Sequence, residues 1–203
     1  MQITNIIFDV GNVLFSYNPK KIINKLTPDS SYKSLYLDAL FSSHYWQQLD
    51  EGTIRKEDVI HEISNTHNLS HNQKQELNHL IDNFIYELDL IHATKDIFEQ
   101  LQKRYKIFIL SNFQSPQFDR LAREYPFLNS ADGKIISAEV KLAKPNPAIY
   151  KCLLSTYKLN AEECLFIDDL AANISAAKKQ GIHGIIFQNE SQLLNELQKL
   201  TLL

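Results

Sequence analysis

The sequence is poor in cysteine, in long apolar runs and in excess charge of either sign. Its two cysteines, Cys152 and Cys164, form neither a metal-ligand motif nor a disulfide framework, so both are expected to be reduced core side chains. No apolar run reaches the ~18 residues of a conventional membrane span. The net charge of −3 and the scattered lysines and arginines lack the basic stripe that is typical of nucleic-acid-binding proteins.

The amino terminus also lacks the pattern of a secretory signal peptide. Residues 1–5 carry no basic region and lead directly into an apolar run, so we expect a cytoplasmic protein. With 203 residues, 44% of them hydrophobic, the chain is long enough for one domain with an insertion. These properties favour a small-molecule partner, with no nucleic acid and no membrane, and leave both a monomer and a homodimer open.

Two short apolar runs in this chain end at carboxylates. Residues 3–8 lead to Asp9, and residues 164–167 lead to the pair Asp168 and Asp169. Such runs predict buried strands, and ligands of an open α/β sheet bind at the carboxyl ends of its strands. Clustered carboxylates repel one another and are costly to bury unpaired, so the pattern indicates a site that needs a cation.

The stretch between residues 16 and 91 differs from the rest of the chain. Helix start signals recur there without a convincing strand, and Ser70 with Gln73 has the pattern of a capping box before a long amphipathic helix. Beyond it, helices and strands alternate, which predicts a parallel sheet covered on both faces. We therefore expect an α/β fold with a Rossmann-like, doubly wound parallel sheet formed by residues 1–15 and 92–203, and an α-helical domain inserted at 16–91.

Four segments fall at predicted strand ends or in the loops beyond them: Asp9 to Asn12, Ser111 with Asn112, Lys144 with Pro145, and Asp168 with Asp169 and Asn173. A carboxylate can attack phosphorus and form an aspartyl-phosphate, which makes Asp9 a candidate nucleophile. Mg²⁺ prefers one or two carboxylates together with water and phosphate oxygens, which fits Asp9 and Asp168 with Asp169 behind them. Ser111 and nearby N–H groups can hold phosphate oxygens, while Lys144 neutralises charge on the transferring group.

These segments resemble the four motifs of the haloacid-dehalogenase (HAD) superfamily hydrolases, in the subfamily that carries a helical cap between the first and second motifs. The similarity covers nearly the whole chain and is carried by residues 7–13, 110–112, 143–150 and 166–169, together with Asn173. The Gly-Asn form of the first motif is similar to a branch of sugar-phosphate phosphatases that includes α-glucose-1-phosphate phosphatases.

The resemblance implies a role for each matching residue. Asp9 and Lys144 would be catalytic, with Asp9 as the nucleophile, and the phosphate would be bound by Ser111, Asn112 and Lys144. The metal would be Mg²⁺, and its ligands would come from the carboxylates of Asp9, Asp168 and Asp169 and from the main-chain carbonyl of Gly11.

One position departs from the pattern of the superfamily. Most of its phosphatases have a second aspartate two residues after the nucleophile, which serves as general acid and base, whereas this chain has Gly11. A positioned acid or base is worth about 10²–10⁴-fold in rate, so its absence predicts a slow or a selective enzyme. A readily departing leaving group, such as the anomeric oxygen of a sugar 1-phosphate, would depend less on protonation.

The sequence thus predicts a Mg²⁺-dependent phosphoric monoester hydrolase that acts on a small phosphorylated metabolite through an aspartyl-phosphate on Asp9, and Gly11 favours a sugar 1-phosphate as that metabolite. Two alternatives stay open. A 2-haloacid dehalogenase also uses a nucleophilic aspartate and needs no acid at Gly11, but it has no need for Asp168 and Asp169. A catalytically impaired HAD protein would bind a phosphorylated ligand without turnover.

The predicted insertion contains a group of aromatic and basic residues that admits two interpretations. In one interpretation they meet the substrate above Asp9. In the other, Tyr45 and Trp46 fill the helical core while Arg55 points to solvent. The group consists of His44, Tyr45, Trp46 and Arg55. Phe113 and Gln114, just beyond Ser111, are further candidates for the entrance of the site.

Overall fold

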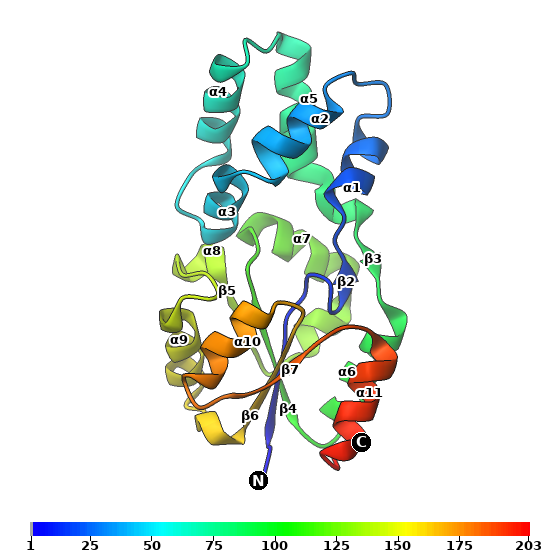
Figure 1. The fold of residues 1–203 in the computed structure, drawn as a ribbon, viewed down its shortest axis with the longest axis vertical. Coiled ribbons are helices and arrows are strands. Elements are labelled where there is room, and N and C mark those ends of the chain that lie inside the picture. Colours follow the sequence, from blue (N-terminus) through cyan, green and yellow to red (C-terminus); the bar gives the residue numbers. More distant parts are fainter. Residues whose placement is uncertain (1) are drawn as a thin grey trace.

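Five parallel strands form the central sheet in the order β5-β4-β1-β6-β7 (Figure 1). The computed structural model describes residues 2–203. Its strands are β1 (Asn5–Phe8), β4 (Lys106–Ser111), β5 (Gly133–Ile136), β6 (Cys164–Asp168) and β7 (His183–Ile186). The three middle strands are buried along almost their whole length, because helices cover both faces of a parallel sheet. The predicted α/β parallel sheet is therefore confirmed.

Alternate side chains of the strands enter two separate hydrophobic layers. Ile6 and Phe8 of β1 pack on one side and Ile7 on the other, as the two-residue period of a strand requires. The first layer is closed by α6 (His92–Gln102), α7 (Ser115–Glu124), η3 (Pro126–Ser130) and α11 (Glu190–Lys199). The second is closed by α9 (Pro147–Tyr157) and α10 (Ala171–Lys178), and the short helices α8 (Ser137–Val140) and η4 (Ala161–Glu163) lie in the connections.

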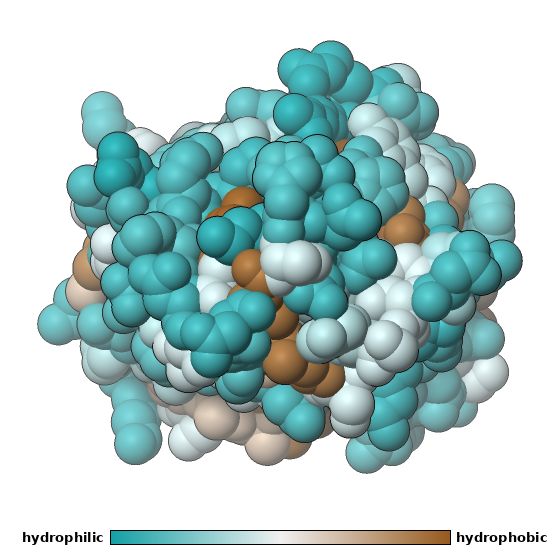
Figure 2. Space-filling model, turned by 90° about the horizontal axis from the view of Figure 1, so that it is seen from above, coloured by the Kyte–Doolittle hydropathy of each residue, from teal (hydrophilic) through white to brown (hydrophobic). Residues whose placement is uncertain are grey.

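A helical insertion, residues 17–88, leaves and re-enters the core through two short strands. β2 (Phe15–Ser16) and β3 (Asp89–Leu90) pair antiparallel, so the two ends of the insertion lie side by side. The insertion comprises α1 (Pro19–Leu26), α2 (Lys33–Tyr36), the π-helix η1 (Leu37–Phe41), α3 (His44–Glu51), α4 (Lys56–Thr66), α5 (His71–Asn83) and η2 (Phe84–Glu87). It forms the upper part of the molecule in Figure 1, and its outer face is mainly hydrophilic (Figure 2).

Local signals in the sequence set where these helices begin. The side chain of Asn18 accepts a hydrogen bond from the Lys21 N–H at the start of α1, directly before Pro19. Ser70 and Gln73 form the predicted capping box at the start of α5. α3 ends at Gly52, whose left-handed φ of 68° suits glycine.

The insertion rests directly on the core above the carboxyl edge of the sheet. α3 packs so closely on α8 that a Cβ added to Gly52 would lie 2.5 Å from the carbonyl oxygen of Ala138 (Figure 1). Farther along, Gln117 of α7 donates a 3.1 Å hydrogen bond to the carbonyl of Ile81. These contacts place the helices of the insertion over the ends of β1, β4 and β6.

The expectation of a core position holds for one of the two cysteines. Cys164 is buried on β6, whereas Cys152 on α9 is partly exposed, and both thiols are free. No helix within residues 2–203 is long and apolar enough to cross a membrane.

Candidate active site

The register of three neighbouring strands brings the predicted site residues to one edge of the sheet. Phe8 of β1 is aligned with Ile109 of β4 and Ile167 of β6, so the residues that follow these positions lie close together. Asp9 and Asp168 are both almost fully buried there. The carboxyl edge of a parallel sheet is the usual place for a ligand, because the loops that leave it are free to vary.

Asp9 has one carboxylate oxygen held by the protein and one left available. Its Oδ1 accepts hydrogen bonds from the Val10 N–H at 2.7 Å and the Ser111 hydroxyl at 2.9 Å, and it forms an ion pair with Lys144 Nζ at 2.8 Å. No side chain or main-chain group among residues 2–203 donates to its Oδ2. The carboxylate is thus fixed in orientation while Oδ2 stays free to react or to bind a cation.

Lys144 joins the two buried aspartates. Its ammonium lies 2.8 Å from an oxygen of Asp9, 2.8 Å from Asp168 Oδ2 and 2.9 Å from the carbonyl of Leu110, with only 1% of the side chain exposed. These three contacts use all three of its N–H donors. Burial works to lower the pKa of Lys144, but the charges of Asp9 and Asp168 outweigh it and raise that pKa. Lys144 is therefore a charged group.

The side chain of Asn112 forms two hydrogen bonds with the main chain of Lys144. Its Nδ2 donates to the Lys144 carbonyl at 2.9 Å, and its Oδ1 accepts from the Lys144 N–H at 2.8 Å. Because both ends of the amide are engaged, the side chain fixes the position of Lys144. A phosphate contact through Asn112 would come from its main chain and stays a prediction.

Asp168 and Asp169 lie in different surroundings. Asp168 is fully buried and accepts from the Leu170 N–H at 2.8 Å and from Asn173 Nδ2, which lies 3.0 Å from each carboxylate oxygen. Asn173, whose role the sequence left open, is thus a partner of a site carboxylate. Asp169 is partly exposed and accepts a 3.1 Å hydrogen bond from Asn12.

The cluster carries more negative charge than its one cation balances. Oxygens of Asp9, Asp168 and Asp169 all lie within 4.8 Å of one another. Burial raises the pKa of Asp9 to about 7, although Lys144 opposes the shift and Asp168 adds to it. Burial also raises the pKa of Asp169. An all-oxygen donor set with unbalanced negative charge fits a hard divalent cation such as Mg²⁺. Gly11 lines the same pocket as Asp9 and Asp169, and its carbonyl stays a predicted ligand.

A pocket of about 340 Å³ opens above these carboxylates, between the sheet edge and the insertion. From the core it is lined by Asp9, Gly11, Asn12, Asn112, Phe113, Lys144, Asp169 and Asn173, among others, and from the insertion by Tyr17, Phe41, Trp46, Gln47, Asp50, Phe84 and Leu88. The predicted nucleophile Asp9 and the predicted metal ligands Gly11 and Asp169 therefore share one cavity with aromatic side chains of the helical insertion, and Asp168 lies buried beneath it.

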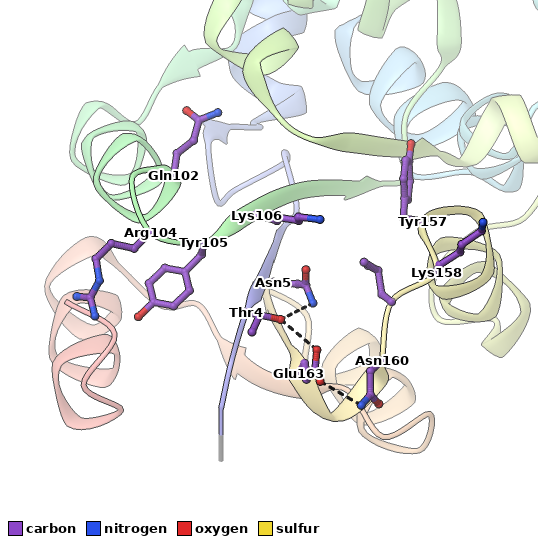
Figure 3. A pocket seen from close by; sticks show the side chains of 11 residues that line it. Thr4, Asn5, Gln102, Arg104, Tyr105, Lys106, Tyr157, Lys158, Asn160 and Glu163 are labelled. Carbon is purple, nitrogen blue, oxygen red and sulfur yellow. Dashed lines mark hydrogen bonds between the residues drawn. The ribbon is translucent and has the colours of Figure 1, made fainter.

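A wider hollow of about 530 Å³ lies at the opposite, amino edge of the sheet (Figure 3). Some of its side chains pair with one another, since Thr4 donates to Glu163 at 3.2 Å and Asn160 donates to the same carboxylate at 3.3 Å. It contains neither the carboxylate cluster nor Lys144. The smaller pocket, where the chemically active groups converge, is the candidate active site.

The structure separates the aromatic and basic residues that the sequence grouped together. Trp46 satisfies both interpretations, because it is 6% exposed and also lines the pocket. His44 and Tyr45 stack on each other at 4.1 Å outside the pocket lining, and Arg55 forms an exposed ion pair with Asp58.

Other pocket residues carry no motif in the sequence. Phe113 lines the pocket as predicted, whereas Gln114 reaches the insertion and donates a 3.3 Å hydrogen bond to Asp50. Tyr17 and Asp50 were not predicted, because a tyrosine after a short strand and an acid on a helix are common surface patterns.

Comparisons with known proteins agree with this geometry. A family model described as haloacid dehalogenase-like hydrolase matches residues 3–181. The chain is 24% identical to the sesquiterpene phosphatase astK of Aspergillus oryzae, over 96% of this chain and 94% of that protein. It is 23% identical to the D-ribitol-5-phosphate phosphatase of Bacteroides thetaiotaomicron, over 97% of each.

The fold has a counterpart among solved structures. A HAD family enzyme from Bacteroides thetaiotaomicron, in complex with magnesium and inorganic phosphate, superposes with a TM-score of 0.75. The alignment has 19% sequence identity and covers 94% of this chain and 98% of that one. At this identity the likeness establishes the fold alone.

Proposed function

Because this chain belongs to the haloacid dehalogenase-like hydrolases, we propose that it is a Mg²⁺-dependent phosphatase that hydrolyses a small phosphorylated metabolite through an aspartyl-phosphate on Asp9. The observation that carries the proposal is the state of the Asp9 carboxylate. Three donors hold its Oδ1, its Oδ2 accepts no hydrogen bond from residues 2–203, and Asp9 lines a pocket together with Lys144 and Asp169. A fixed carboxylate with one free oxygen is suited to nucleophilic attack.

In the first step, Asp9 Oδ2 attacks phosphorus and the bond from phosphorus to the ester oxygen breaks. Lys144 and the Ser111 hydroxyl keep the carboxylate in place and lie where they can offset negative charge on the phosphoryl oxygens. The departing ester oxygen takes a proton from solvent and leaves as the alcohol. In the second step, water attacks phosphorus and loses a proton to solvent, the bond between phosphorus and Asp9 Oδ2 breaks, and inorganic phosphate leaves with the Asp9 carboxylate regenerated. The side chain that would take the proton from this water in most relatives is absent at Gly11.

The metal in this proposal is Mg²⁺, held by Asp9, Asp168, Asp169 and the carbonyl of Gly11. When bound, it supplies positive charge that draws the anionic phosphate toward Asp9 and polarises it. Asp168 is kept in place for this role by Lys144, Asn173 and the Leu170 N–H.

We also propose residues 16–91 as a cap domain, on a core domain of residues 1–15 and 92–203. The insertion supplies the roof of the pocket through α3 and η2, and its two connections run side by side in β2 and β3. Two adjacent connections allow a roof to move as one body, and closure would exclude water from the aspartyl-phosphate.

The names of the relatives support phosphate ester chemistry, and their leaving groups differ. One is named for a sesquiterpene and the other for D-ribitol 5-phosphate, so they leave the organic part of the substrate open. A haloacid dehalogenase reaction is less compatible with the site. Three carboxylates and one lysine would repel an anionic haloacid in the absence of a divalent cation.

The test is hydrolysis of p-nitrophenyl phosphate with and without Mg²⁺ by the wild type and by Asp9→Asn. We expect Asp9→Asn to lose at least about 10³-fold in kcat, because the amide is not a nucleophile, while the fold persists. The exposed Asp29→Asn serves as a matched control and should keep full activity.

Two further readouts distinguish the alternatives. A phosphoenzyme that hydroxylamine cleaves would identify the acyl phosphate on Asp9. Halide release from 2-chloropropionate with no phosphate release would favour the dehalogenase, and phosphate binding with no turnover of any ester would favour the impaired binding protein. Equal rates for the wild type and Asp9→Asn would refute the mechanism.

A further inference from the structure

The pocket above Asp9 has aromatic walls that are already packed in place. Phe41 contacts Trp46 at a ring-centroid distance of 4.4 Å, Trp46 contacts Phe84 at 5.0 Å, and Phe84 contacts Phe113 at 5.6 Å. Each of these four side chains is at most 7% exposed. A ligand would therefore meet a rigid apolar surface beyond its phosphate group, as is usual for small-molecule sites.

One hydroxyl group among these aromatic side chains has no hydrogen-bond partner. The Tyr17 ring stacks on Trp46 at 6.3 Å, and its OH is buried without a hydrogen bond. Of the three side-chain groups in residues 2–203 that share this condition, only Tyr17 lines the pocket, since Ser64 and Thr94 lie elsewhere. A buried hydroxyl without a partner is costly, and tyrosine normally finds one. The missing partner is therefore expected to come from a ligand.

Asp50 provides a second polar group in the same corner of the pocket. It lies on α3, one turn after Gln47, and its carboxylate accepts a single side-chain hydrogen bond, from Gln114 at 3.3 Å. Tyr17 and Asp50 both line this pocket, and burial raises the pKa of Tyr17. Burial also raises the pKa of Asp50 well above its usual range. A carboxyl that accepts one side-chain hydrogen bond keeps further acceptor capacity, which a substrate hydroxyl can use.

From this arrangement, and resting on the proposed phosphatase activity, we propose that the substrate is a phosphate monoester with a compact, mainly apolar carbon skeleton that carries a hydroxyl group bound by Tyr17 and Asp50. The phosphate lies at Asp9, the skeleton lies along Trp46 and Phe84, and the hydroxyl reaches the polar corner. Tyr17 and Asp50 are then specificity-determining residues.

A polyol is a poorer match to the same pocket. A sugar would place several hydroxyls against aromatic rings, where they lose water without gaining hydrogen bonds, and the corner formed by Tyr17, Gln47 and Asp50 could receive few of them. The sugar 1-phosphate suggested by the first motif stays a prediction, and glucose 1-phosphate is accordingly included among the competing substrates.

The experiment compares three phosphate esters of primary alcohols, so that their leaving groups are matched in reactivity. They are hexyl phosphate, 6-hydroxyhexyl phosphate and glucose 6-phosphate, assayed with Mg²⁺ by release of inorganic phosphate. Glucose 1-phosphate is assayed beside them as the competing sugar 1-phosphate. Because each buried methylene is worth about fourfold in binding, hexyl phosphate should exceed glucose 6-phosphate in kcat/KM by at least about tenfold. The chain length of the ω-hydroxyalkyl ester is varied to find the best fit. At that length, its kcat/KM should exceed that of the matched alkyl ester by about tenfold.

Tyr17→Phe tests the polar corner, because it removes an oxygen that has no partner in the protein and keeps the stacked ring. We expect the ratio of kcat/KM between the hydroxyalkyl and the alkyl ester to fall from about ten to between one and about three. Tyr86→Phe, at a tyrosine that is 54% exposed, is the matched control and should keep the wild-type ratio.

Failure of this inference is distinguishable from failure of the proposed function. If p-nitrophenyl phosphate is hydrolysed in an Asp9-dependent way but glucose 6-phosphate or glucose 1-phosphate exceeds every alkyl ester, the substrate class is wrong and the phosphatase stands. A Tyr17→Phe enzyme that keeps the hydroxyl preference would show that the corner holds only water. If no phosphate ester is hydrolysed, the proposed function itself is wrong.

Discussion

Replacing Gly11 by aspartate would supply the acid and base that this chain lacks, and the structure shows that the residue has room. A Cβ built on Gly11 has no heavy atom within 4 Å outside its immediate neighbours. The glycines with left-handed φ in the described chain are Gly52 and Gly181, so aspartate at position 11 meets no backbone strain of that kind. Gly11 lines the same pocket as Asp9, so the new carboxyl would be introduced beside the candidate nucleophile.

The expected gain depends on the leaving group. A well-placed acid is worth up to about 10²-fold for an alkyl phosphate, which corresponds to roughly 2.7 kcal/mol of barrier. An aryl phosphate, whose leaving group departs without a proton, should gain much less. A fourth carboxyl close to Asp9, Asp168 and Asp169 also adds negative charge that attracts a divalent cation, so the Mg²⁺ concentration needed for half-maximal activity should not rise.

The assay measures kcat/KM for a series of aryl phosphates and for hexyl phosphate with wild type, Gly11→Asp and Gly11→Asn. The asparagine variant has nearly the same size and shape but carries no carboxylic proton, so it controls for the change in packing. We expect a shallower dependence of rate on leaving-group pKa in Gly11→Asp alone. A uniform gain across all esters, or an equal gain in Gly11→Asn, would refute the argument that protonation of the leaving group limits this enzyme.

Two further predictions concern the charged site. The pKa of Asp9 is about 7 in the metal-free folded protein, which is above its value in the unfolded chain. Between these two pKa values the folded state binds more protons than the unfolded state. The free energy of unfolding should therefore fall as the pH rises from about 4 to 7. Added Mg²⁺ should therefore raise the melting temperature more at pH 8 than at pH 5, and an equal shift at both would contradict the metal assignment. Asn112→Ala should lower kcat by about 10–100-fold, because it frees the main chain of Lys144. Circular dichroism checks the fold of this variant, and unchanged kcat would show that Lys144 is positioned without Asn112.

Local patterns in the sequence were sufficient for the secondary structure that frames the site. The apolar runs before Asp9 and Asp168 are strands, and the start of α5 follows from the capping box of Ser70 and Gln73. These features depend on residues close together in the chain, because strand burial and helix capping are short-range effects. The predicted limits of the two domains and the roles of the site residues stay predictions.

The partners of the site residues were decided by the tertiary structure. Asn112 was predicted to bind substrate, yet its side chain holds the main chain of Lys144, thirty-two positions away. Asn173, which the sequence left open, pairs with Asp168. A polar side chain has the same local signature whether its hydrogen bonds go to protein or to ligand, because the partner comes from a distant segment.

The aromatic residues of the insertion show the same limit of prediction from sequence. Trp46 and Phe84 occur at helical positions that are typical of a buried core, and they are buried, but one part of their surface also lines the pocket. Water is excluded from such a ring equally well by protein or by a bound ligand. Periodicity in the sequence therefore determined that these side chains are buried, and only the packing of α3 and η2 above β1 and β4 decided that part of their surface faces the site of Asp9.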